Sequence, residues 1–154
     1  MKKLFVLSLV LSMFGGYSQS NQEEVDYYQS IFGMGKKEVV AEIVSVEAEN
    51  QDAFWKLYDE YEVSRKELGK KRIVLLEKYA NGYAGMSAEE LDGLMKEVMG
   101  LSLKTDKLIG TYYKKIEKEA GVLAASQFYH VEAYLLSEIR VAVLGNTPMV
   151  EKLK

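Results

Sequence analysis

Few side chains in this 154-residue chain suit covalent or acid–base catalysis, and none forms a recognisable motif. Without Cys and with a single His, His130, the chain lacks a credible Ser-His-Asp or Cys-His set. No glycine-rich phosphate loop is present. An enzyme would need carboxylates such as Glu117 or Glu132 gathered in a pocket, which the sequence does not indicate. We therefore predict no catalytic residues and no cofactor, and we expect a protein that is not an enzyme.

His130 has Glu132 two residues further on, and a His with carboxylates nearby is one possible start of a zinc site. Such a site needs three or four convergent ligands, and the sequence offers only one His. His130 is better interpreted as a surface or hydrogen-bonded helix residue. We therefore predict no metal.

Arg65 and Arg72 lie seven residues apart within an otherwise apolar helical stripe. One interpretation is a basic spot that attracts unfolded or acidic chains. The other is structural: each guanidinium pairs with a carboxylate such as Asp106 or Glu132, or its stem packs while its head reaches water. The structural interpretation is preferred, and both stay open at this point.

Tyrosine is abundant, with 11 in the chain. Its ring gives apolar area with a polar tip, which suits adaptable binding surfaces and thin helical cores equally. Together with the two arginines, Tyr58, Tyr61 and Tyr79 form the candidate client- or partner-binding set. The helical spacing of these tyrosines also makes core positions the default.

These residues require long helices to position them. A stripe alternating by four and three residues predicts one helix over about residues 47–83. Ser87 and Glu90 then form a capping box that opens a second helix, which Gly121 breaks. A third helix follows over about 122–144. The fold class is therefore all-α: a long antiparallel helical hairpin with a third packed helix and a short leading helix near 36–46. If the hairpin turns near Ala84, Arg65 lies opposite Leu103 and Tyr58 opposite Gly110.

The first residues have the features of a secretory signal peptide. Lys2 and Lys3 precede an apolar run from Leu4 to Phe14, and small and polar residues follow. The run is too short for a membrane-spanning helix, which needs about 20 residues. We expect residues 1–19 to be a signal peptide cleaved near Ser18–Ser20, residues 20–35 a flexible arm, and residues 36–150 a single helical domain. The expected location is periplasmic, without an integral membrane segment after cleavage.

The charge balance bears on possible partners. Asp and Glu number 23 against 20 Lys and Arg, two of which belong to the expected signal peptide. Nucleic-acid binding needs clustered basic residues to neutralise phosphates, so nucleic acid is not an expected partner.

Three segments carry a family resemblance: Phe54–Glu62 (FWKLYDEYE), Tyr79-Ala80-x-x-Tyr83, and Gln127–Glu132 (QFYHVE). With the signal peptide, the helical hairpin and the lack of Cys, the chain resembles the Spy/CpxP-like periplasmic stress proteins, the LTxxQ family. Val46–Asn50 and Ala120–Ala124 stand where the family's two Leu-Thr-x-x-Gln boxes would fall, and both depart from that motif. The resemblance implies a cradle-like helical protein, often dimeric, whose relatives act as ATP-independent chaperones, bind a sensor kinase or bind zinc.

Two functions follow as expectations. The first is a non-enzymatic binding protein of the cell envelope, chaperone-like or a stress adaptor, which holds client or partner segments on a helical cradle. The alternative is a structural or regulatory subunit that docks one specific envelope partner through the residue 20–35 arm. Because a thin helical layer has little interior, part of its apolar stripe is expected to face a partner, and a homodimer is one possibility.

Overall fold

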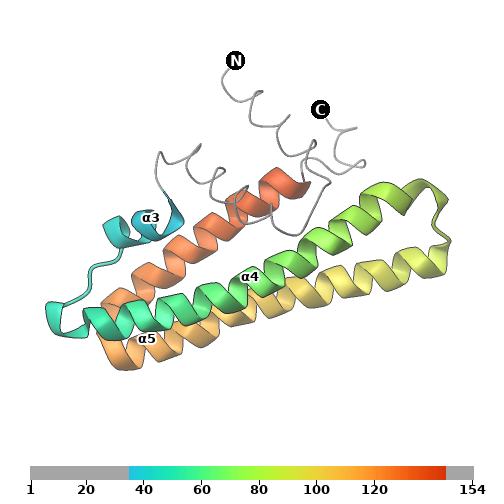
Figure 1. Cartoon of the computed structure of the whole chain (residues 1–154). Coiled ribbons are helices and arrows are strands. Elements are labelled where there is room, and N and C mark those ends of the chain that lie inside the picture. The colour runs from blue at the N-terminus through green and yellow to red at the C-terminus, as the bar shows by residue number, and fades with distance from the viewer. Residues whose placement is uncertain (1–34, 145–154) are drawn as a thin grey trace, which may run out of the picture. The chain divides into compact units, whose positions relative to one another are not determined.

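A computed structural model describes residues 35–144 of the chain (Figure 1). The predicted signal peptide, and all of the predicted arm except residue 35, lie outside the described residues. The chain divides into two units, residues 1–44 and 45–154. The second unit contains the long helices and is described by itself below.

The short leading helix is confirmed. Helix α3 spans Lys36–Ile43, and Val39 and Val40 are among its buried residues. The Glu38 carboxylate accepts a 2.8 Å hydrogen bond from the backbone N–H of Gly35, which satisfies a donor at the start of the helix. Helix α3 belongs to the first unit, whereas the predicted helical domain began at residue 36.

The second unit begins with the 3₁₀ turn η1 (Ala48–Asn50), which leads into helix α4 (Gln51–Gly82). The 32 residues of α4 correspond to about 48 Å of helix. The prediction of one long helix is confirmed, although its first residues form the 3₁₀ turn. The buried residues of α4 are Phe54, Tyr58 and Tyr61, all in its first third.

The connection to the next helix has the predicted chemistry. The 3₁₀ turn η2 (Tyr83–Gly85) follows α4, and helix α5 spans Ala88–Leu144. Ser87 Oγ accepts a hydrogen bond from the backbone N–H of Glu90 at 3.3 Å, and the Glu90 carboxylate accepts one from the N–H of Ser87 at 2.8 Å. This reciprocal capping box fixes the start of α5.

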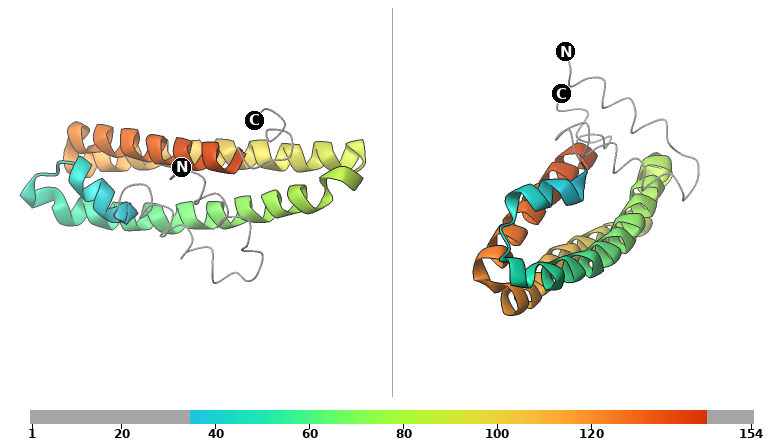
Figure 2. Two further views of the ribbon diagram at one scale, coloured as in Figure 1. Left: turned by 90° about the horizontal axis from the view of Figure 1, so that it is seen from above. Right: turned by 60° about the vertical axis from the view of Figure 1, so that its left-hand side comes forward.

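Gly121 interrupts α5 with φ 89° and ψ 163°, a backbone conformation open essentially to glycine alone. Beyond it the helix reverses, so its second half (residues 122–144) runs back along its first half (residues 88–120) (Figures 1 and 2). Two contacts demonstrate the reversal: the rings of Tyr113 and Tyr129 are 6.2 Å apart, and Arg140 Nη2 donates to Asp106 Oδ1 at 2.8 Å. The predicted break and third helix are thus confirmed.

The core is concentrated near this reversal. Tyr61 contacts the rings of Tyr112 and Phe128, at 5.5 and 5.1 Å between centroids, and so joins α4 to both halves of α5. The other residues of this core are Phe54, Tyr58, Ile109, Ile116, Ala120, Ala124, Ala125, Val131, Glu132 and Leu135. We call residues 51–65 and 109–135 the packed end.

The remainder of the hairpin, residues 66–82 and 88–108, is called the distal hairpin. Its one buried apolar residue is Leu94, and the described part of the chain holds no strand. The all-α hairpin with a third helix is confirmed.

The predicted register is wrong. Leu103, expected opposite Arg65, is 71% exposed, and Tyr61 pairs with Tyr112. The predicted inward position Met95 is likewise 41% exposed, whereas its neighbour Leu94 is 1% exposed. Leu94 therefore replaces Met95 at this one position of the stripe, whereas the predicted inward positions Ile109, Tyr112 and Ile116 are buried.

Candidate binding surface

The candidate residues divide between the two ends of the hairpin. Tyr58 and Tyr61 lie in the packed end and are each 1% exposed. A client could reach them only if the helices separated. They are core residues in this structure, which agrees with the default given by their helical spacing, and we do not place them on a binding surface.

Tyr61 also carries the buried polar contact of the packed end. Its hydroxyl donates a 2.6 Å hydrogen bond to Oε2 of Glu132, and Glu132 is 2% exposed. Burial raises the pKa of Tyr61 well above its usual value, and the negative charge of Glu132 raises it further. A buried carboxylate needs such a donor, so this bond fixes the second half of α5 against α4.

Arg65 is neutralised within its own helix. Its Nε and Nη2 donate to the two carboxylate oxygens of Glu62 at 2.6 and 2.9 Å. The expected cross-helix partners were Asp106 and Glu132, but Asp106 bonds to Arg140. The partner three residues away was visible in the sequence, because positions i and i+3 are neighbours on a helix. Arg65 thus follows the structural interpretation.

Arg72, two helical turns beyond Arg65, has different surroundings. It is half-buried, and within residues 35–144 it has no hydrogen bond or ion pair. Burial lowers the pKa of Arg72, the positive charge of Arg140 lowers it further, and Asp106 opposes both effects. Arg72 therefore lies within electrostatic range of both halves of α5.

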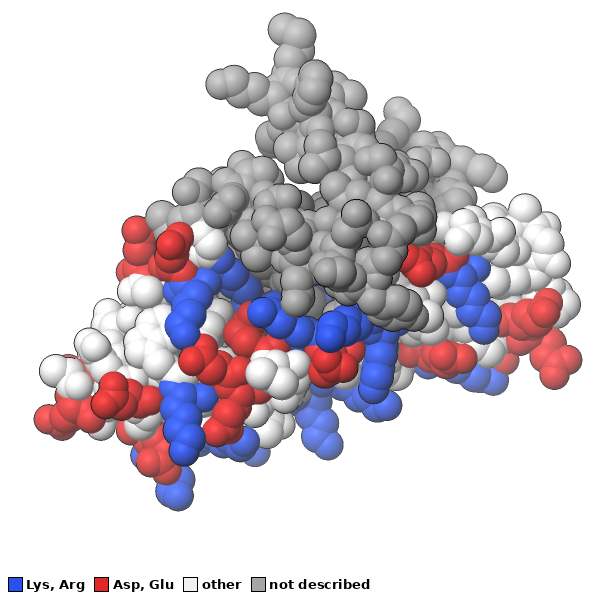
Figure 3. Space-filling model, viewed as in Figure 1, with Lys and Arg blue, Asp and Glu red and all other residues white. Residues whose placement is uncertain are grey.

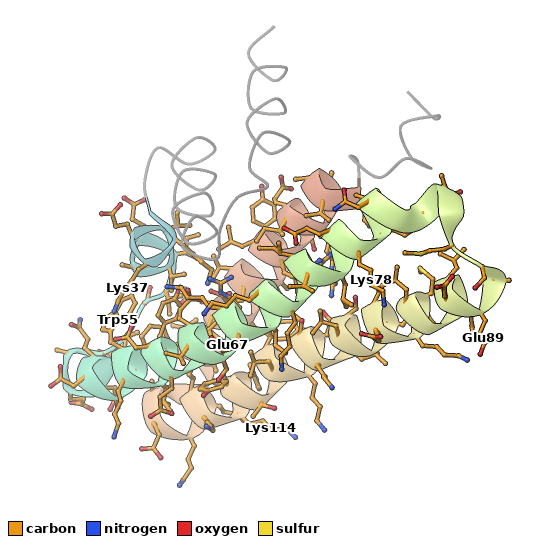
Figure 4. The ribbon with its side chains drawn as sticks, turned by 45° about the vertical axis from the view of Figure 1, so that its right-hand side comes forward. Lys37, Trp55, Glu67, Lys78, Glu89 and Lys114 are labelled. Carbon is orange, nitrogen blue, oxygen red and sulfur yellow. The ribbon has the colours of Figure 1, made fainter. Side chains whose placement is uncertain are left out.

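Tyr79 lies near the connected end of the hairpin, far from the packed end. It is half-buried, and its ring centroid is 4.9 Å from that of Tyr83. Desolvation and the neighbouring Tyr83 raise the pKa of Tyr79. Figure 4 shows how far apart the two ends are, with Trp55 near the start of α4 and Lys78 near its end. The five candidate residues therefore do not form one site.

The structure adds apolar surface residues that the sequence did not single out. On the distal hairpin five large apolar side chains are exposed: Ile73, Val74, Met95, Met99 and Leu103. Four of them, all except Met95, lie off the predicted stripes. The sequence did contain a signal for them, because each helix carries apolar residues on more than one side. A layer of two helices can bury only one side of each helix.

Charged side chains surround these residues. On the face shown in Figure 3, positive and negative groups are interspersed over the described residues. Residues 66–78 of α4 nevertheless carry five basic against two acidic side chains. The distal part of α4 is therefore locally positive, although the whole chain is acidic.

His130 is exposed, and its Nδ1 lies 2.7 Å from the carbonyl oxygen of Ser126 one turn earlier. Over residues 35–144 no group of three His, Asp or Glu side chains is placed to hold a metal ion. Within the same range, no helix is both long and apolar enough to cross a membrane.

The three segments that carry the family resemblance are not gathered in one place. Residues 54–62 and 127–132 meet in the packed end, where Tyr58 and Phe128 are 6.4 Å apart between ring centroids. Gln127 Oε1 also accepts a 2.8 Å hydrogen bond from the backbone N–H of Ser45. Tyr79 and Tyr83 lie in the distal hairpin. The pattern therefore combines core residues with a separate aromatic pair.

Comparison with protein-family models, curated proteins and solved structures gave no match for this chain.

Proposed function

We propose that this protein is a non-enzymatic binding protein of the periplasm, which holds segments of client polypeptides on its distal hairpin. The observation that carries the proposal is the set of five exposed apolar residues on the distal hairpin, whose one buried apolar residue is Leu94. Three of them, Met95, Met99 and Leu103, are four residues apart and so share one face of α5. A contiguous exposed apolar face of this kind is typical of a surface that a partner covers. Methionine suits varied partners, because its flexible thioether adapts to different surfaces.

The resemblance to Spy/CpxP-like proteins supports the same class of function, chaperone-like or stress adaptor, and the signal-peptide features of residues 1–19 support export. A homodimer would offer two distal hairpins to one client. Light scattering of the purified protein gives the mass that distinguishes one copy from two.

The test measures suppression of aggregation of a thermally unfolded client enzyme at equimolar protein. A variant with Met95→Gln, Met99→Gln and Leu103→Gln should lose most of this activity while keeping its helical circular dichroism. The matched control is Val122→Gln with Leu123→Gln, which changes two residues, each 61% exposed, beside the Gly121 reversal. The control should behave as the unmodified protein.

No suppression by the unmodified protein would overturn the proposal, as would equal loss in both variants. Deleting residues 20–35 tests the alternative of a subunit that docks one partner through its arm. That alternative predicts lost capture of the partner from an envelope extract, whereas client holding predicts unchanged suppression of aggregation.

A further inference from the structure

The side of α5 that contacts its own second half extends beyond the contact. Tyr113 of the first half lies against Tyr129 of the second, with 6.2 Å between the ring centroids. Asp106, seven residues before Tyr113, accepts a 2.8 Å hydrogen bond from Arg140. Met99 lies a further seven residues back, and positions seven apart share one side of a helix. Met99 therefore lies on the side of α5 along which the second half runs.

This side becomes apolar and exposed where the second half ends. Met95, Met99 and Leu103 occupy successive turns of α5 and are all exposed, and we call them the α5 face. Leu144, the last residue of α5, is four residues beyond Arg140, and the antiparallel direction brings it near the level of Leu103. The chain therefore leaves α5 beside the α5 face.

The ten residues that follow in the sequence, 145–154, can reach the whole face. From Leu103 to Met95 the distance along the helix is about 12 Å. Ten residues span about 15 Å as a helix and about 33 Å when extended, so the segment is long enough in either conformation. It contains three large apolar residues: Met149, Val150 and Leu153.

The charges of the two segments are complementary. Residues 88–96, where α5 begins, carry three acidic side chains and one basic side chain. Asp92 among them lies seven residues before Met99 and is therefore on the side of the α5 face. Residues 145–154 carry two basic side chains and one acidic, and both lysines follow Met149 and Val150. A segment that continues in the direction of the second half places its apolar residues on the α5 face and its lysines toward the acidic start of α5.

We propose that residues 149–153 bind to the α5 face as an internal occupant that client segments displace. The inference rests on the proposed client-binding function and adds a regulation to it, because a molecule with the segment bound cannot hold a client on the same face. Binding within one chain avoids the translational entropy that a separate client loses, so three apolar residues are a sufficient competitor.

Methionine oxidation tests this contact without any client. Hydrogen peroxide converts an accessible methionine thioether to the sulfoxide, and peptide mass spectrometry gives a separate rate for each methionine. Met95 and Met99 report on the α5 face of the full chain. Met86, in the connection between η2 and α5, is the internal reference, because it lies outside the face.

The test variant makes the segment polar by three substitutions: Met149→Gln, Val150→Gln and Leu153→Gln. If the segment covers the face in about 80% of the unmodified molecules, Met95 and Met99 should oxidise about fivefold faster in this variant. The rate at Met86 should stay the same. The matched control is Asn146→Gln with Thr147→Gln, which keeps the apolar residues and should oxidise as the unmodified protein does.

Two outcomes would overturn the internal occupant. One is equal oxidation of Met95 and Met99 in the unmodified protein and the test variant, at equal helical circular dichroism. The other is protection in the unmodified protein that disappears on dilution, because a second copy of the chain would then cover the face.

The same proteins separate this inference from the proposed function. Suppression of client aggregation with unchanged methionine oxidation would overturn the internal occupant and leave client binding intact. Faster oxidation in the test variant, without suppression by either protein, would retain the occupant and overturn the chaperone-like function. If both hold, the test variant should suppress aggregation at a lower protein concentration than the unmodified protein.

Discussion

The packed end and the distal hairpin are built from the same two helices, yet they differ in what those helices bury. In the packed end a third segment, the second half of α5, covers the hairpin and encloses Phe54, Tyr58, Tyr61 and Phe128. In the distal hairpin, residues 66–82 and 88–108, Leu94 is the one buried apolar residue. Two helices have a contact line rather than an interior, so a third segment is required before large side chains are fully enclosed. The comparison indicates that stability resides at one end and available surface at the other.

The largest expected effect tests this division directly. Phe128→Ala should destabilise the protein by about 3–5 kcal/mol, because it removes a fully buried ring. Met99→Ala, at a position that is 54% exposed, should stay within about 0.5 kcal/mol of the unmodified protein. Urea denaturation followed by circular dichroism measures both. Similar costs at the two positions would show that the ends do not differ in packing.

A second prediction concerns the buried polar contact of the packed end. Tyr61→Phe should cost about 1.5–3 kcal/mol, since it deprives the Glu132 carboxylate of a buried donor. The pKa of Tyr61 is raised in the folded protein, so folding favours the protonated phenol. Its stabilisation is therefore present below about pH 10, where an unfolded tyrosine ionises, and declines as the pH rises above that value.

The gap in unfolding free energy between the unmodified protein and Tyr61→Phe should accordingly shrink from pH 9 to pH 11. Denaturation curves for both proteins across this range provide the measurement. A gap that stays constant with pH would mean that Tyr61 ionises equally easily in both states.

The third prediction compares two glycines of α5. Gly121→Ala should destabilise the protein by about 1–3 kcal/mol, because alanine strains at φ 89° and ψ 163°. Gly93→Ala should instead stabilise it by about 0.5–1 kcal/mol, since Gly93 lies in an exposed helix with no atom within 4 Å of an added Cβ. Thermal melts of both variants test the opposite signs, and a neutral Gly121→Ala would argue against the reversal.

The smallest effect belongs to the start of α5 in the distal hairpin. Ser87→Ala removes the side-chain oxygen that caps the helix and should cost about 1 kcal/mol. Ser87→Asp, which retains an acceptor, is the control and should be close to neutral. If hydrogen exchange shows no faster opening of residues 88–94 in Ser87→Ala, the cap does not limit fraying there.

Much of the fold could be predicted because the residues that start and end its helices act locally. Ser87 and Glu90 satisfy each other within one turn, and Gly121 marks a backbone conformation closed to other residues. Such features depend on a few neighbouring residues and not on the rest of the molecule. Helix positions, the break and the all-α class could therefore be inferred from the sequence.

The register and the binding surface could not be predicted in the same way. A stripe alternating by three and four residues permits several pairings of antiparallel helices, and the choice depends on how Tyr61 fits against Tyr112 and Phe128. The surroundings of Arg72 depend on where the second half of α5 ends, because Arg140 lies near its last turns. Both are properties of three segments together, so patterns within one helix do not contain them.

The reversal at Gly121 has a consequence for how the chain tolerates changes in length. Helix flanks this glycine directly on both sides, so there is no loop to absorb an extra residue. One residue inserted there would rotate the following helix by about 100° about its axis. Phe128, Val131 and Leu135 would then turn away from the hairpin together. Residues 83–87 are different, because this connection between α4 and α5 is not α-helical. An inserted residue there can be accommodated by a change in the backbone path of the connection. Length variants should therefore be accepted at one end of the hairpin and rejected at the other.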